Sequence, residues 1–210
     1  MARNIQARKV ESQPESALGK RMTRAILDIA GHVPDTDEHK THGPERRARA
    51  IAGAAANKAA LTAGTLALPP GPLGWLTILP ELTYIWRIQS QMVADIAGAY
   101  GASAGLTRSH MLHCLFRHAA AQAVRDIGAQ VGARLLIQDV PLRVIERTAA
   151  KIGVSVSKRI AGQGIARWLP VFGAVGVGAY AYYDTTQVAR SAIALFGNGT
   201  AHAKATPVPE

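Results

Sequence analysis

Residues 58–101 read KAALTAGTLALPPGPLGWLTILPELTYIWRIQSQMVADIAGAYG. The part from Ala59 to Leu79 carries no charge and is nominally long enough to cross a bilayer. Its middle is interrupted by helix-breaking residues, namely Pro69, Pro70, Gly71, Pro72 and Gly74. We therefore expect one helix to end, a loop to turn, and a second helix to begin. A shallow or re-entrant hairpin in lipid stays open as an alternative.

The rest of the chain also predicts helices, because no segment alternates apolar and polar residues over any length. A second uncharged run, from Trp168 to Tyr183, is shorter and contains Pro170 near its start. The expected fold class is all-α, a compact bundle of about five to seven helices. The expected helices cover residues 45–68, 80–100, 107–136, 142–163 and 170–196.

Small residues recur at a spacing of four, which places them on one side of a helix. Because small side chains let helix backbones approach closely, these rows predict close helix crossings. The same rows would also suit helices that meet inside lipid. They consist of Ala56, Ala60 and Gly64; Ala97, Gly101 and Gly105; and Gly128 and Gly132.

The two ends differ in composition from the middle. Residues 1–43 mix prolines, acidic residues and basic residues, and predict a flexible basic arm with one short helix around residues 17–30. Residues 44–197 form the expected helical domain. Residues 198–210 lack periodic apolar positions and predict a disordered tail.

The composition bounds the class of protein. The chain has 210 residues, is 48% hydrophobic but only 5% aromatic, and carries a formal net charge of +10. Wholesale disorder and coiled coil are excluded by this composition. The one cysteine, Cys114, forms no internal disulfide, and no apolar run follows the first basic residues. We therefore expect a protein of the reducing cytoplasm.

Positive charge is concentrated between Arg108 and Arg167, a range that contains ten basic residues and three acidic ones. Such a field attracts phosphate on lipid or on nucleic acid. In the helix expected over 142–163, the basic side chains fall within about 80° of a helical wheel, opposite an apolar face. The basic residues are Arg143, Arg147, Lys151 and Lys158, and the apolar ones are Ile145, Ala149, Ile152, Val156 and Ile160.

This pattern is a basic amphipathic helix. It suits either a membrane surface or an ordinary bundle helix with a solvated basic face. Nucleic-acid binding is less favoured, because no aromatic residues interleave with the basic ones and no known nucleic-acid motif accompanies them.

A polar stripe follows Pro80. Its members fall within an arc of about 120° on a helix: Glu81, Tyr84, Arg87, Gln91 and Asp95. A second, shorter stripe in the last helix faces it in the expected bundle and consists of Asp184, Gln187 and Arg190. We favour a structural seam in which Arg87 pairs with a carboxylate and with backbone carbonyls. The alternative is a polar cleft that binds a ligand.

No catalytic signature is present. His110, Cys114 and His118 share one face of the expected helix, but the outer pair is about 12 Å apart by helical rise, so we expect no metal site. The glycines at 173, 176 and 178 have the wrong order for a phosphate-binding loop. We also expect no cofactor, and no nucleophile stands beside a base. The sequence favours a protein that is not an enzyme.

The run quoted first resembles the EcsC family of bacterial proteins, and so does the later run LPVFGAVGVGAYAYYDTTQVARSAIALF at residues 169–196. The matching positions are Pro80, Glu81, Arg87, Ala97, Tyr100, Gly101, Gly173 and Gly176. This chain has Glu81 where the family more often has Asp. The resemblance implies a mainly helical protein from a family named for a product encoded beside an ABC transporter. It brings no established catalytic activity, and it is compatible with a peripheral role at the inner face of the membrane.

These observations together predict a cytoplasmic, non-enzymatic protein whose partner is anionic lipid or a membrane protein. The alternative is an enzyme or a small-ligand protein with a buried cleft around Glu81, Arg87 and Asp95, to which Tyr100, Asp184 or Arg190 contributes. A homo-oligomer is left open by the sequence.

Overall fold

Helices make up all the regular structure in the described part of the chain. The structure is a computed structural model that describes residues 19–66, 74–118, 141–163 and 170–205. Within these ranges, the side chains of residues 74–79, 81, 158–163, 170–174 and 199–205 are not described. An N-terminal helix covers residues 19–31. The later elements are α2 (Pro44–Leu66), α3 (Gly74–Tyr100), the short 3-10 helix η1 (Ser103–Gly105), α4 (Arg108–Phe116), α6 (Leu142–Gln163) and α7 (Pro170–Ala205).

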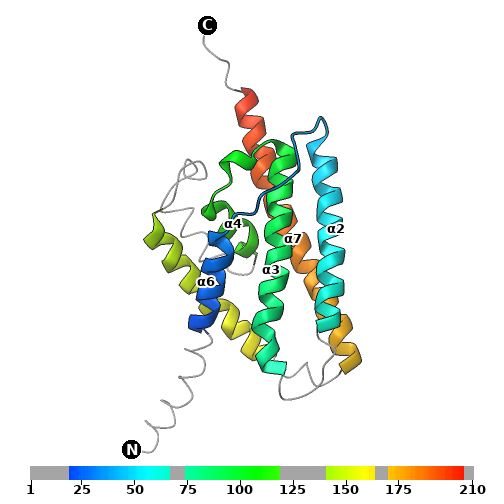
Figure 1. The fold of residues 1–210 in the computed structure, drawn as a ribbon, viewed down its shortest axis with the longest axis vertical. Coiled ribbons are helices and arrows are strands. Elements are labelled where there is room, and N and C mark those ends of the chain that lie inside the picture. Colours follow the sequence, from blue (N-terminus) through cyan, green and yellow to red (C-terminus); the bar gives the residue numbers. More distant parts are fainter. Residues whose placement is uncertain (1–18, 67–73, 119–140, 164–169, 206–210) are drawn as a thin grey trace, which may run out of the picture.

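The helices form a bundle in which α2, α3 and α7 contact one another pairwise. The shorter α4 packs on α3, α6 and α7, and the N-terminal helix and α6 cover the other side of the core (Figure 1). The predicted fold class, a compact all-α bundle, is confirmed. The α2 and α3 helices run in opposite directions, so residues 67–73, which lie outside the described part and hold most of the Pro/Gly stretch, connect them.

Large apolar side chains from five helices meet in one core. The fully buried ones include Met22 and Ile26 of the N-terminal helix, Met92 of α3, Phe116 of α4 and Ile152 of α6. The ring of Phe116 stands edge-on to that of Trp86, with 5.2 Å between ring centroids. This core joins α4 and the N-terminal helix to the three long helices, so the end of α4 has a fixed position.

Small residues bring α2 and α7 close together, as their spacing predicts. A Cβ atom added at Gly178 would lie 3.0 Å from the carbonyl oxygen of Ala60 and 3.8 Å from the Cα of Gly64. At the end of α3, Gly101 has φ +74°, and the amide of Ala102 donates to the carbonyl of Ala97 at 2.8 Å. This is the glycine-terminated helix end that an L side chain would strain.

The short helix expected around residues 17–30 is present at residues 19–31, but this helix and the residues up to 43 pack on the bundle and do not form a flexible arm. The N-terminal helix buries Met22, Ile26 and Ile29 in the core. Residues 32–43, here called the crossing segment, then pass over the end of α3, where the amide of Thr41 donates to the carbonyl of Ala99 at 3.2 Å. A Cβ at Gly98 would lie 2.5 Å from the carbonyl oxygen of Glu38, so the crossing segment needs a glycine beneath it.

The predicted helix boundaries agree with the structure to different degrees. The bounds predicted for α6 are confirmed, and α2 agrees within two residues at each end. Helix α3 begins at Gly74, so Pro80 lies inside it and removes one backbone hydrogen bond. Helix α7 continues to Ala205, so residues 198–205 are helical and do not belong to a disordered tail. Helix α4 ends at Phe116, and residues 119–136 of the predicted helix lie outside the described part.

Among the described residues, no helix combines the length and the apolar character that crossing a membrane requires.

Candidate functional site

The predicted polar stripe of α3 does not form one seam. Tyr84, Arg87 and Gln91 are exposed, and Arg87 makes no ion pair with a carboxylate whose side chain is described, Asp95 included. The side chain of Glu81 lies outside the description. The stripe forms no continuous seam because the crossing segment occupies its far end, where a facing helix was expected.

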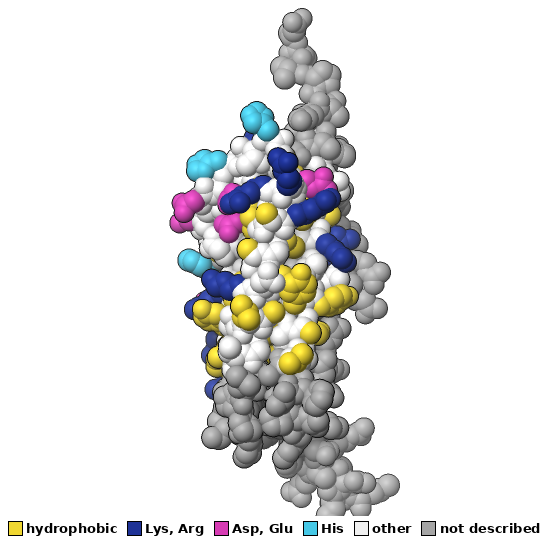
Figure 2. Space-filling view, turned by 90° about the vertical axis from the view of Figure 1, so that its right-hand side faces the viewer, with side chains coloured by type: hydrophobic (Ala, Val, Ile, Leu, Met, Phe, Trp, Pro, Cys, Tyr) yellow, Lys and Arg dark blue, Asp and Glu magenta, His cyan; other side chains and the backbone are white. Residues whose placement is uncertain are grey.

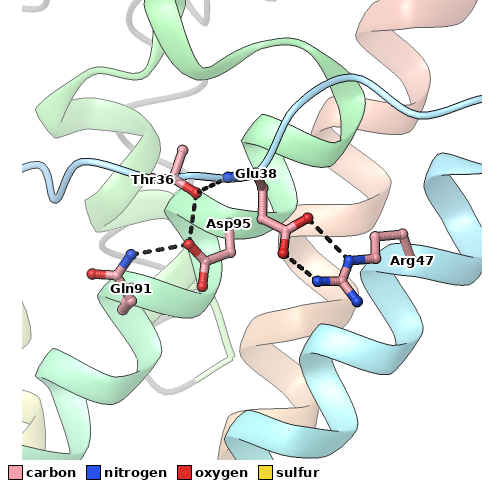
Figure 3. Close-up of polar contacts among 5 residues, drawn as sticks. All are labelled: Thr36, Glu38, Arg47, Gln91 and Asp95. Atoms are coloured by element: carbon pink, nitrogen blue, oxygen red, sulfur yellow. Dashed lines mark hydrogen bonds and ion pairs between the residues drawn. The ribbon is translucent and has the colours of Figure 1, made fainter.

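At that end, α3 holds the crossing segment by hydrogen bonds (Figure 3). The Asp95 carboxylate accepts from the hydroxyl of Thr36 at 2.7 Å and from the Gln91 amide at 2.9 Å. The Gln91 amide nitrogen also donates to the backbone carbonyl of Asp35 at 2.9 Å. The Thr36 hydroxyl accepts from the amide of Glu38 at 3.1 Å.

An ion pair between Glu38 and Arg47 then ties the crossing segment to α2. The hydrogen bond from Arg47 is the main cause that lowers the pKa of Glu38, and the same bond raises the pKa of Arg47. An open hollow of about 460 Å³ lies here, lined by Asp35, Asp37, Glu38, Gln91 and Asp95. The described residues contain no group of three or more His, Cys, Asp or Glu side chains able to hold a metal ion. The contacts of this hollow are those of a structural junction.

A second polar cluster lies inside the bundle, between α3, α7 and the residues that follow α4. The amide nitrogen of Gln89 donates to the Asp184 carboxylate at 2.8 Å and to the Thr185 hydroxyl at 3.1 Å. The other Asp184 oxygen lies 2.6 Å from Nε2 of His118. We call these four residues the polar cluster. Asp184 therefore meets Gln89, which is not in the predicted stripe.

Two atoms of the polar cluster are buried without a hydrogen-bond partner among the described residues: Oε1 of Gln89 and Nδ1 of His118. Gln89 is fully buried, and Asp184 and His118 are mostly buried. The signal that could have found Gln89 is its place in the sequence, because it interrupts the apolar row of Ile85, Met92 and Ile96 on α3. A polar residue in such a row needs a partner across the core.

The histidines and the cysteine near α4 do not converge on a metal. His110 caps α4, since its Nδ1 accepts from the amide of Thr107 at 3.0 Å. Burial raises the pKa of the Cys114 thiol to about 12, so it stays protonated. Burial, with the nearby charges of Arg117 and His110, lowers the pKa of His113 to about 4. His118 points instead to Asp184.

The two remaining members of the predicted seam lie apart from the polar cluster. Tyr100 is buried at the end of α3, where its ring faces Gly197 of α7, and burial raises the pKa of its hydroxyl. Arg190 is exposed on α7. The structure thus separates the predicted seam into a junction at Asp95, a polar cluster at Asp184 and exposed side chains.

The basic face predicted on α6 is exposed. Arg143, Arg147 and Lys151 lie on the solvent side, whereas Ile145, Ala149 and Ile152 are buried. The side chain of Lys158 lies outside the description. Among the described side chains of α6, two large apolar ones are also exposed: Leu142 by 56% and Val154 by 50%. We keep the name basic face of α6 for Arg143, Arg147, Lys151 and Lys158.

A different face of the molecule, the one that α2 presents, also carries exposed apolar side chains. Figure 2 shows hydrophobic side chains gathered over the lower half of its described part, with Lys and Arg side chains mostly above them. On α2, Leu61 is exposed by 72%, and on α7, Val175 by 69%. This face supplies control positions for the experiments below.

The chain matches no protein-family model, no curated protein and no solved structure. The resemblance to the EcsC family thus stays a prediction.

Proposed function

We propose that this protein binds the surface of an anionic membrane through the basic face of α6, as a peripheral protein without catalytic activity. The observation that supports the proposal is the exposure of Arg143, Arg147 and Lys151 along one side of a helix whose other side is buried. Each such side chain near an anionic bilayer contributes about 1 kcal/mol of attraction. Attachment through these charges is reversible and weakens as salt screens them.

The exposed apolar residues of α6 favour a membrane over nucleic acid as the source of phosphate. Val154 lies three residues after Lys151 and seven after Arg147, which places it on the same side of the helix as both. An apolar side chain among cations is stabilised when it inserts at the boundary between lipid head groups and acyl chains. It gains little binding energy from the phosphate backbone of a nucleic-acid duplex, which is contacted by charged and hydrogen-bonding groups.

The proposal is tested by flotation with vesicles of graded anionic lipid content at low and high salt. We expect the wild-type protein to float with anionic vesicles at low salt and to be released at high salt. In the variant R143Q/R147Q/K151Q/K158Q, we expect the affinity at low salt to fall at least tenfold. A variant that floats like the wild type would contradict the proposal.

The matched control removes the same number of charges elsewhere, in R46Q/R49Q/K58Q/R190Q. These four side chains are exposed on α2 and α7. We expect this control to bind within about threefold of the wild type, because its removed charges lie away from the contact surface and are screened. Equal losses in the two variants would indicate a response to net charge alone.

The rival hypothesis, an enzyme or a small-ligand protein, has less support. Its predicted cleft needs Arg87 and Asp95 to face a common space, but Arg87 is exposed and Asp95 binds the crossing segment. What favours it is that one buried atom of Gln89 and one of His118 have no hydrogen-bond partner in the part of the chain that the structure describes. No nucleophile is hydrogen-bonded to His118 in the described residues, so the polar cluster by itself defines no reaction.

A further inference from the structure

We infer that the N-terminal helix forms the second half of the membrane-binding surface, so that the protein presents a two-helix basic platform to anionic lipid. The inference rests on the proposed function of α6. The platform consists of Lys20, Arg21 and Arg24 from the N-terminal helix and Arg143, Arg147 and Lys151 from α6.

The first support is direct contact between the two helices. A Cβ atom at Gly153 of α6 would lie 2.5 Å from the hydroxyl of Thr23, 3.0 Å from the Thr23 amide nitrogen and 3.2 Å from the carbonyl oxygen of Gly19. Two of these three atoms belong to the backbone, so the helices meet with nothing between them. The Thr23 hydroxyl itself donates to the carbonyl of Gly19 at 2.9 Å, which fixes it at the crossing.

The second support is a shared core. The N-terminal helix buries Met22 and Ile26, and α6 buries Ile145 and Ile152, all in the same cluster of apolar side chains. Figure 1 shows the blue N-terminal helix and the yellow-green α6 crossing on one side of the bundle. Two touching helices that bury one side each in one core present their opposite sides to the same region of solvent.

The third support is the charge on those opposite sides. The solvent sides carry six basic residues, and the acidic residues exposed on the described parts of these two helices are Asp28 and Glu146. Arg143, Arg147 and Lys151 follow one another at intervals of one turn, so they extend over about 12 Å of α6 by helical rise and form a row of cations on its surface. Such a spread fits a plane of lipid head groups better than one soluble phosphate compound.

The N-terminal half of the platform is tested with the variant K20Q/R21Q/R24Q. It is compared with the α6 variant R143Q/R147Q/K151Q and with the control variant R46Q/K58Q/R190Q. Each of the three variants lacks three positive charges. Affinity for vesicles containing anionic phospholipid is measured at low salt, after circular dichroism shows unchanged helix content and melting. We expect each platform variant to bind about tenfold or more weakly than the wild type, the two sets combined to abolish binding, and the control to stay within about threefold.

The outcomes separate the inference from the proposed function. Loss in the α6 variant with wild-type binding in K20Q/R21Q/R24Q would overturn the two-helix platform and leave the α6 proposal standing. Wild-type binding in both would overturn both. Binding of duplex DNA that is tighter than vesicle binding and depends on the same six residues would overturn lipid as the partner, and so would stoichiometric binding of inorganic tripolyphosphate.

The junction between the helices gives an independent test. G153A places a methyl group 2.5 Å from the Thr23 hydroxyl, which is held by its bond to Gly19, and 3.0 Å from the Thr23 amide nitrogen, so the N-terminal helix is pushed away from α6. We expect G153A to lower vesicle affinity severalfold although it removes no charge. G176A is the matched control, because a Cβ at Gly176 meets nothing within 4 Å. Wild-type affinity in a G153A protein whose N-terminal helix has shifted, as shown by amide exchange at residues 19–31, would overturn the platform.

Discussion

Replacing Phe116 with alanine is expected to lower the free energy of unfolding by about 4 kcal/mol, since removal of a large buried side chain costs its transfer free energy and leaves a cavity. Phe116 is 1% exposed and contacts Trp86 edge-on, so it joins α4 to α3. Urea denaturation followed by circular dichroism measures the change, with the slope of the transition checked for constancy.

The matched control for Phe116→Ala is Tyr182→Ala, which truncates an aromatic side chain of similar size that is 45% exposed. We expect this control to cost less than 1 kcal/mol. Phe116→Leu keeps most of the buried volume and should fall between the two. A loss below about 1 kcal/mol in Phe116→Ala would show that α4 does not pack on α3 in this way.

Replacing Asp184 with alanine is expected to cost about 3 kcal/mol of stability. The change takes away one acceptor of the buried Gln89 amide and the partner of His118, and unpaired buried polar groups are costly. Equilibrium unfolding of Asp184→Ala, Gln89→Ala and the double variant measures the coupling. We expect the double variant to cost at least 1 kcal/mol less than the sum of the single ones.

The control for the Asp184 series is Glu146→Ala, which removes an exposed carboxylate from α6. It should change stability by about 0.5 kcal/mol or less. Additive costs in the Gln89 and Asp184 cycle would contradict the hydrogen bond between these residues. So would an Asp184→Ala variant as stable as the wild type.

Sequence patterns within one helix predicted the features of the fold that depend on that helix alone. The helical periodicity of basic and apolar residues predicted the bounds and the buried side of α6, because amphipathic periodicity is a property of one helix alone. The spacing of Ala60 and Gly64 predicted a close crossing, and Gly178 of α7 supplies the other side of it. The predicted start of α3 at Pro80 is wrong, because a proline is also tolerated inside a helix near its start. Helix α3 begins at Gly74.

The contacts that join distant residues could not be predicted in this way. A helical wheel shows which side chains share a side, but it does not show what faces them. Asp184 and Gln89 are 95 residues apart, and Thr36 and Asp95 are 59 apart. The sequence predicts a flexible arm in place of the crossing segment, because Pro34 and the charged residues around it are typical of loops. Its attachment depends on Gly98 and Asp95, which belong to a different part of the chain.

The basic side of the N-terminal helix is also hard to predict from the sequence. Ten basic and seven acidic residues in the first 50 nearly cancel, so a charge count gives this region little weight. Its acidic residues, however, are concentrated in the crossing segment, around Asp35, Asp37 and Glu38. The helix over residues 19–31 itself contains three basic residues, Lys20, Arg21 and Arg24, and one acidic residue, Asp28, so its exposed side is positive although the charges of the whole region nearly cancel.

The claim that α6 faces the membrane is tested most directly by an environment-sensitive fluorophore on a cysteine introduced at position 154, compared with one at position 61. The native Cys114 is buried and holds its proton, so labelling under native conditions is selective for the introduced thiol. Val154 and Leu61 are both exposed, on α6 and on α2. With anionic vesicles, we predict that emission from position 154 shifts to shorter wavelength and is shielded from an aqueous quencher, while emission from position 61 stays unchanged. A shift at position 61 with none at position 154 would contradict the proposal.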